Sequence, residues 1–128
     1  MLFAYVDTSL VVAMKIAETL PDDVVEVVSS IPNLYSSYLL EAETRSTVAR
    51  FKLDFQNHWL EGIRWISHHT SLTQEYETVL EAGYLRGADL WHVATALHLW
   101  KNPSEIGFFT LDLKQHEVAR KLGFQVLQ

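Results

Sequence analysis

Apolar residues follow two alternating patterns along this chain, short unbroken runs and longer stripes at helical spacing. The first run, Leu2–Val6, has the length and the β-prone residues of a buried strand, and it stops at Asp7. Apolar positions then recur at helical spacing from Leu10 to Ala17, which predicts a helix. Runs and stripes alternate to the end of the chain, so we expect an α/β fold with a central, mainly parallel sheet and helices on both faces.

The later elements differ in how clearly their pattern identifies them. Segment 24–28 fits a strand or a helix equally well. Further strands are expected at Asn33–Ser36, Arg64–His68, Gly107–Leu111 and Phe124–Leu127. Further helices are expected from Ser36 or Ser37 onward, within Phe55–Trp65, from a Ser71–Gln74 capping box through Tyr84, from Gly87 to the Asn102–Pro103 break, and over Glu117–Leu122.

The clearest helical stretch is Arg86–Trp100, where apolar residues such as Val93 and Leu97 recur at helical spacing. Asp89 falls in its first turn, where a carboxylate suits the unpaired N–H groups and the positive end of the helix dipole. A helix cap is therefore one interpretation of Asp89. A site residue is the other, and the choice depends on whether further carboxylates lie at comparable element ends.

Two glutamates compete for one inward-facing position on the helix that starts near Ser37. At about 100° per residue, one stripe of this helix consists of Leu39, Ala42, Ser46, Ala49 and Leu53. Glu43 lies about 70° from the centre of that stripe, whereas Glu41 points to the opposite side. We therefore expect Glu43 to reach the interior, where a carboxylate is costly unless it is paired or bound to a metal. The alternative is that Glu43 simply reaches water.

Length, charge and composition restrict the classes of protein to which this chain can belong. Its 128 residues suit one domain, 1–128, and its 48% of hydrophobic residues exclude disorder. The net charge of −6 excludes a broad basic surface for nucleic acid, so a metal or a local basic rim would have to offset the acids. The sequence has no cysteine, signal peptide or membrane-length apolar run, which fits a cytoplasmic protein with no membrane partner.

Four carboxylates are placed where the predicted elements meet. Asp7 and Asp112 each follow a predicted central strand, and these strand ends share one edge if the sheet is parallel. Asp89, at a helix start, and Glu43, on an inward face, can converge there. Four carboxylates in one place repel one another strongly unless a divalent cation binds. Ligation by oxygen atoms alone is typical of magnesium or manganese rather than zinc.

Four segments appear along the chain in this order: YVDTS (5–9), SSYLLEAETR (36–45), RGADLWHVATAL (86–97) and FFTLD (108–112). Together they resemble the PIN-domain ribonucleases, and most closely the VapC toxins of bacterial toxin–antitoxin pairs. The resemblance implies a PIN-like three-layer α/β/α sandwich, and it places the family's catalytic, metal-binding acids on Asp7, Glu43, Asp89 and Asp112. Thr110 matches a hydroxyl residue often found two positions before the last acid.

The same resemblance implies a function and its partners. The expected activity is that of a Mg²⁺-dependent endoribonuclease, with Mn²⁺ as a possible substitute, that cleaves RNA and is inhibited by a VapB-like antitoxin. A homodimer is also implied, with partner contacts on Val12–Ala17 and on the Tyr38–Phe55 helix. The residue types agree with this chemistry, because carboxylates can hold one or two metal ions on a phosphate while an activated water attacks phosphorus. With no cysteine and no serine evidently paired with a base, a covalent route is not expected.

Some neighbours of these acids have more than one interpretation. Thr8 and Ser9 are expected to cap the first helix, although a hydroxyl beside Asp7 could instead orient its carboxylate. His92, three residues after Asp89, is expected to pack or to form a hydrogen bond rather than to act in catalysis. A rim that meets RNA phosphates, or alternatively a set of surface ion pairs, is expected from Arg45, Arg50 and Arg86.

Two other functions compete with a nuclease. A catalytically silent PIN-like module would only bind a partner, and the presence of all four acids argues against it. A doubly wound phosphatase or phosphoacceptor is the other candidate. Haloacid-dehalogenase-like phosphatases need a second aspartate where this chain has Ser9, and a receiver domain needs an acidic neighbour that Asp7 lacks.

Overall fold

Four parallel strands form the central sheet, as the alternation of apolar runs and helical stripes predicted. The computed structural model describes all 128 residues. The strand order is β3-β2-β1-β4, and all three neighbouring pairs are parallel. The strands are β1 (Phe3–Val6), β2 (Asn33–Ser37), β3 (Ile63–Ile66) and β4 (Gly107–Phe109).

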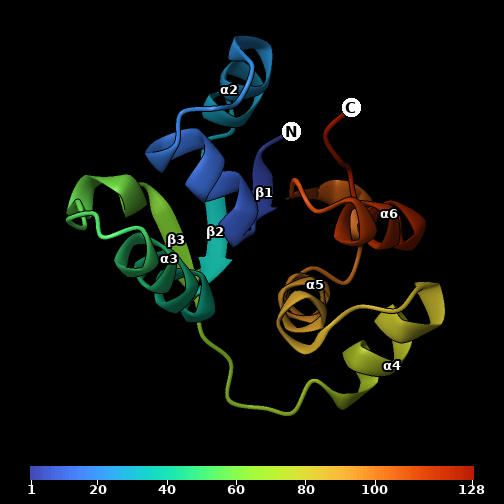
Figure 1. Cartoon of the computed structure of the whole chain (residues 1–128). Coiled ribbons are helices and arrows are strands. Elements are labelled where there is room, and N and C mark those ends of the chain that lie inside the picture. The colour runs from blue at the N-terminus through green and yellow to red at the C-terminus, as the bar shows by residue number, and fades with distance from the viewer.

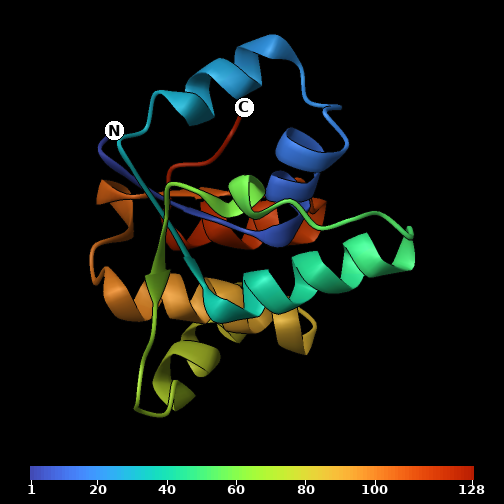
Figure 2. The ribbon, with the colours of Figure 1, turned by 90° about the vertical axis from the view of Figure 1, so that its left-hand side faces the viewer.

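Helices cover both faces of this sheet and make a three-layer sandwich (Figures 1 and 2). One face is covered by α1 (Thr8–Val11), its π-helical continuation η1 (Val12–Ile16), α2 (Asp22–Ser29) and α3 (Tyr38–Arg50). The other face is covered by α4 (Thr73–Ala82), α5 (Gly87–Leu99) and α6 (Leu113–Leu122). Two short 3₁₀ turns, η2 (Asn57–Leu60) and η3 (Pro103–Glu105), precede β3 and β4. No helix has the length and apolar character that crossing a membrane requires.

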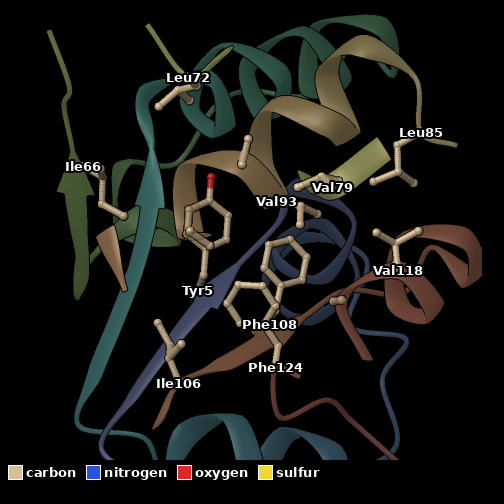
Figure 3. Packing of buried hydrophobic residues seen from close by; sticks show 13 residues of the cluster. Tyr5, Ile66, Leu72, Val79, Leu85, Val93, Ile106, Phe108, Val118 and Phe124 are labelled. Carbon is tan, nitrogen blue, oxygen red and sulfur yellow. The ribbon is translucent and has the colours of Figure 1, made fainter. Parts of the chain in front are cut away.

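The alternation of side chains along the strands divides the core into two clusters. Ala4 and Val6 pack with α1, α2 and α3, whereas Tyr5, which points the other way, packs with α4, α5 and α6. Phe108 lies beside Tyr5 with the two rings stacked, their centroids 5.2 Å apart and their planes at 5° (Figure 3). β1 and β4 are therefore buried on both faces, which explains why they read as unbroken apolar runs, although β4 is the last strand of the sheet and not a central one as predicted.

The order of the strands creates a switch point in the sheet between β1 and β4. Successive crossovers build the sheet from β1 through β2 to β3, and the chain then returns to add β4 on the other side of β1. The carboxyl ends of β1 and β4 consequently lie together where the direction of winding reverses, as the Asp7 N–H shows by donating to the Phe109 carbonyl at 3.2 Å. Ligands of open α/β sheets bind at such switch points.

Three sequence-based assignments of secondary structure were wrong. Phe55–Trp65 is not a helix, since only η2 and the start of β3 are regular there, and Gly62 takes a left-handed φ of 83° that ends the turn. The segment Phe124–Leu127 forms one bridge, from Gln125 to Gly107, rather than a strand. The Ser71–Gln74 capping box does not form, because the Ser71 hydroxyl bonds locally to Thr73.

The buried face of α3 also differs from the predicted stripe. Its core-facing residues are Leu40, Thr44 and Val48, whereas Ala42, Ser46, Ala49 and Leu53 are exposed. The prediction failed because a polar residue, Thr44, lies at the centre of the buried face, while alanines lie outside. Glu43 adjoins the true buried face and is partly buried, so its inward placement was right although the stripe that predicted it was wrong.

Candidate active site

Asp7 is held at the end of β1 by hydroxyl groups and by the start of α1. The residue is 4% exposed, and its carboxylate accepts from the Leu10 N–H at 3.2 Å, so Asp7 itself caps α1. Ser9 Oγ lies 2.8 and 3.0 Å from the two carboxylate oxygens, and Thr110 Oγ1 lies 2.9 Å from Oδ2. Burial raises the pKa of Asp7, and these hydrogen bonds offset only part of that cost. The predicted capping of this helix by Thr8 or Ser9 was therefore wrong.

Gln115 connects the segments that carry three of the acids. Asp112 caps α6 by accepting from the Gln115 N–H at 2.8 Å. The fully buried side-chain amide of Gln115 donates to the Asp89 carbonyl at 3.2 Å, and its oxygen lies 2.7 Å from Thr110 Oγ1. Because Thr110 also contacts Asp7, this one amide and one hydroxyl tie together the ends of β1 and β4 and the start of α5.

Glu43 is positioned by a second, separate network that reaches the core. Its Oε1 accepts from Thr8 Oγ1 at 2.8 Å and lies 2.7 Å from Nε2 of the buried His92. The other ring nitrogen, Nδ1, lies 2.6 Å from the hydroxyl of Tyr5, which is fully buried. The hydrogen bond from His92 is the largest factor that lowers the pKa of Glu43, so Glu43 accepts as a carboxylate.

Asp89 and Asp112 face a hollow that we name the acidic hollow. It has a volume of about 260 Å³ and is lined by Tyr84, Leu85, Arg86, Asp89, Asp112 and Lys114. The Asp89 carboxylate makes no hydrogen bond, so the interpretation of Asp89 as a helix cap was wrong, and the cap position of α5 belongs to Arg86. Partial burial raises the pKa of Asp89, and the charges of Asp112 and Glu43 add to that effect.

The donor set of this hollow fits a hydrated hard cation. Asp89 and Asp112 offer carboxylate oxygens, and their mutual repulsion is what a divalent cation would relieve. Magnesium usually keeps several waters and takes only one or two carboxylates from the protein, which suits an open hollow. No three histidine, aspartate or glutamate side chains are arranged to hold an ion together. Asp7 and Glu43 are instead engaged by hydroxyls and by His92.

The predicted site residues divide into those that the fold gathers and those that it does not. Asp7 and Asp112 follow β1 and β4 at one edge, and Glu43 is close enough to contribute to the raised pKa of Asp89. Arg86 lines the acidic hollow and favours the ionised form of Asp89.

Arg45 and Arg50 do not join this group. Arg45 pairs with Glu41 at 2.9 Å and lies over the ring of Phe55, 4.0 Å from its centroid, and these contacts direct it to the outer side of α3. Arg50 is exposed in the last turn of the same helix. Of the predicted basic rim, only Arg86 is therefore beside the acids, and the surface ion pair was the correct alternative for Arg45.

Sequence reasoning missed several residues that organise this site. Gln115 carries no motif, and only its distance of three residues from the cap Asp112 could have drawn attention to it. Lys114, which lines the acidic hollow, was not among the predicted site residues. His92 was expected to pack or hydrogen-bond and does both, but its partners Tyr5 and Glu43 are 87 and 49 residues away in the sequence, beyond any local pattern.

Comparison with known proteins identifies the fold. No family model matches the sequence, and no curated protein matches it. Among solved structures, a chain of VapBC-1 from nontypeable Haemophilus influenzae superposes with a TM-score of 0.62 at 15% sequence identity, over 98% of this chain and 96% of that chain. The four parallel strands between two layers of helices thus form a PIN-like α/β/α sandwich, as predicted, and this chain shares that fold with the VapBC-1 chain.

Proposed function

We propose that this protein is a Mg²⁺-dependent endoribonuclease, the toxin of a toxin–antitoxin pair. The observation that carries the proposal is the acidic hollow at the switch point of the sheet, which Asp89 and Asp112 line together and where neither of them forms an ion pair. Asp7 and Glu43 lie in the surrounding networks as further carboxylates. The likeness of the fold to VapBC-1 supports the same assignment.

Different residues of this chain would bind the metal ion and orient the substrate phosphate. Asp89 and Asp112 would hold Mg²⁺, or Mn²⁺ in its place, and the waters around it. Such an ion, when bound, activates water for attack on phosphorus and offsets charge on the departing oxygen. Arg86 and Lys114, on the same hollow, would orient the substrate phosphate. Glu43 is kept ionised and fixed by Thr8 and His92, ready to accept a proton or a cation.

A free ribonuclease in the cytoplasm requires an inhibitor, and the acidic hollow suggests how one acts. An antitoxin of the VapB kind could place an arginine between Asp89 and Asp112, because a guanidinium forms two parallel hydrogen bonds with carboxylates. It would compete with the cation for the same oxygens. We further propose that the complex holds two copies of this chain, by analogy with the toxin family that the sequence resembles.

The test compares two matched pairs of variants on purified RNA. Asp89→Asn and Asp112→Asn should lower cleavage by at least about 100-fold, the upper end of what loss of an outer-shell partner costs. Asp22→Asn and Asp54→Asn remove the same charge from exposed positions and should cleave like the parent. Expression of the parent alone should arrest growth, and the hollow variants should not.

A silent partner-binding module is the alternative, and one observation favours it. Asp7 and Glu43 are already satisfied by protein groups, and Asp7 and Asp112 both cap helices, which are structural roles. Unchanged growth arrest in Asp89→Ala, Asp112→Ala and Asp7→Ala would establish this alternative and exclude the nuclease.

A further inference from the structure

We propose that a groove beside Tyr84 binds single-stranded RNA, with one base stacked on the Tyr84 ring and phosphates held by Arg86, Lys114 and Lys121. This inference rests on the proposed nuclease function, since it names the form of RNA that is led to the acidic hollow. The groove consists of the acidic hollow and a second hollow next to it.

The two hollows adjoin and share their dividing residues. The second hollow has a volume of about 410 Å³ and lies between the end of α4 and one side of α6. Tyr84 and Lys114 line both hollows, and Lys121 lies along the second. The loop that joins α4 to α5 carries Tyr84 and borders α6 (Figure 1). An extended chain could therefore run from the second hollow past Tyr84 to Asp89 and Asp112.

Tyr84 offers an aromatic face that the protein leaves uncovered. Its side chain is 72% exposed, and it takes part in no aromatic pair and no side-chain hydrogen bond. Tyr38, the other strongly exposed tyrosine, is by contrast stacked on Trp65 at 5.4 Å. A free ring in a hollow suits a nucleobase, because every base has a π-face and stacking tolerates any sequence. A duplex keeps its bases stacked on each other, so the ring selects single strands.

The charges along the groove suit a phosphate chain. The protein carries a net charge of −6, so any attraction for RNA has to be local. Arg86, Lys114 and Lys121 line the two hollows and form none of the ion pairs in the structure. Glu117, the one acid of the second hollow, is paired with Arg120. The groove thus leads from a basic end to an acidic end, as a nuclease needs if a metal ion is to sit at the acids.

The experiment measures the dissociation constant of a fluorescent single-stranded RNA pool by anisotropy, in EDTA so that no cleavage occurs. Tyr84→Leu, which keeps apolar bulk but removes the aromatic face, should weaken binding by about 5- to 100-fold, the range for one stacked base. Tyr84→Phe should bind like the parent. Tyr38→Leu, at the stacked tyrosine, should also bind like the parent, and a duplex of the same RNA should bind more weakly.

The salt dependence tests the cations separately. Lys114→Gln with Lys121→Gln should lower the slope of log Kd against log salt by about 1.4, since each phosphate contact on a single strand contributes about 0.7. Lys15→Gln with Lys101→Gln, which lie outside the groove, should leave the slope unchanged.

The remaining outcomes distinguish a failure of the proposed groove from a failure of the proposed nuclease function. A parent that binds and cleaves RNA while Tyr84→Leu binds equally well would overturn the groove and leave the nuclease intact. Binding that depends on Tyr84 in a protein that never cleaves would keep the groove and overturn the nuclease. If the parent does not bind single-stranded RNA at all, the groove is overturned. If Tyr84→Leu still binds RNA but no longer binds the antitoxin, this surface belongs to a protein partner instead.

Discussion

Nε2 of His92 lies 2.7 Å from Oε1 of Glu43, so a core histidine fixes a partly buried acid of α3. Because Glu43 is ionised and can only accept, Nε2 must carry the hydrogen. The hydroxyl of Tyr5 keeps its proton because burial raises its pKa, and it lies 2.6 Å from Nδ1 and donates to Ser37 Oγ at 3.2 Å. The imidazole therefore connects Glu43 to the buried Tyr5, and the orientation of Glu43 depends on the packing of β1 and α5.

Removing the imidazole should cost stability and displace Glu43. His92→Leu leaves the Tyr5 hydroxyl and one Glu43 oxygen without this partner, so we expect the free energy of unfolding in urea to fall by about 1–3 kcal/mol. His92→Gln, whose amide N–H can stand in for Nε2–H, should recover part of the loss. RNA cleavage by His92→Leu should fall by about 10- to 100-fold, as for a lost outer-shell partner. Equal cleavage by the Leu and Gln variants would show that His92 only packs.

Asp7→Asn should stabilise the protein at neutral pH. The folded-state pKa of Asp7 lies above its unfolded value because of burial, so the folded protein bears an unfavourable charge whenever the pH exceeds the folded pKa. Removing that charge should raise the free energy of unfolding at pH 7 by roughly 0.5–2 kcal/mol, the usual range for single stabilising changes. The gain should shrink as the pH falls through the folded pKa and vanish below the unfolded pKa. A gain of the same size at low pH would refute the role of charge.

Glu43→Gln should have the opposite effect to Asp7→Asn. The pKa of Glu43 is lowered in the folded state, so its ionised form contributes stability above the unfolded pKa, and this contribution is lost as the pH falls through the folded pKa. We expect Glu43→Gln to destabilise the protein at pH 7 by about 1 kcal/mol and to abolish RNA cleavage. Glu41→Gln removes only an exposed partner of Arg45 and should change both little. Thermal unfolding and a gel assay of the two variants side by side decide between them.

The acids at the carboxyl edge of the sheet could be predicted from the sequence because their position depends on the residues next to them. An aspartate directly after an apolar run marks a strand end, and parallel strands bring such ends together, so Asp7 and Asp112 could be placed without coordinates. The face of α3 could not be derived in the same way, since Thr44 at the core and alanines at the surface remove the hydrophobic contrast. Periodicity reports burial only where the buried residues are apolar.

The contacts that assemble the site were also beyond the sequence. The partners of His92 come from β1 and α3, and Gln115 reaches the start of α5, so each contact requires the packing of segments that are distant along the chain. The acids themselves were predicted by residue type and place. Only the structure shows how these acids differ. Hydroxyls bind the carboxylate of Asp7, His92 binds Glu43, and Asp89 and Asp112 line the acidic hollow.

Divalent cations should stabilise the protein through the acidic hollow. The pKa of Asp89 is raised first by burial and then by the charge of Asp112, and a cation bound to both carboxylates would relieve that repulsion, so Mg²⁺ or Mn²⁺ should raise the melting temperature with increasing concentration. At 100 times its dissociation constant, an ion that binds only the folded state adds about 2.7 kcal/mol. Asp89→Asn with Asp112→Asn should remove most of this rise, whereas Asp22→Asn with Asp54→Asn should retain it. A double hollow variant that gains as much as the parent would show that the ion binds elsewhere.

The chemical identity of the RNA ends tests the central claim most directly. If the carboxylates act through a cation and water, cleavage must require Mg²⁺ or Mn²⁺ and leave a phosphate monoester on one end and a hydroxyl on the other. Mass spectrometry of the products, with and without EDTA, measures both properties. We predict metal-dependent monoester ends that disappear in Asp89→Asn and Asp112→Asn. Products with 2′,3′-cyclic phosphates, formed equally in EDTA, would mean that the ribose hydroxyl attacks without a metal, and would contradict this account.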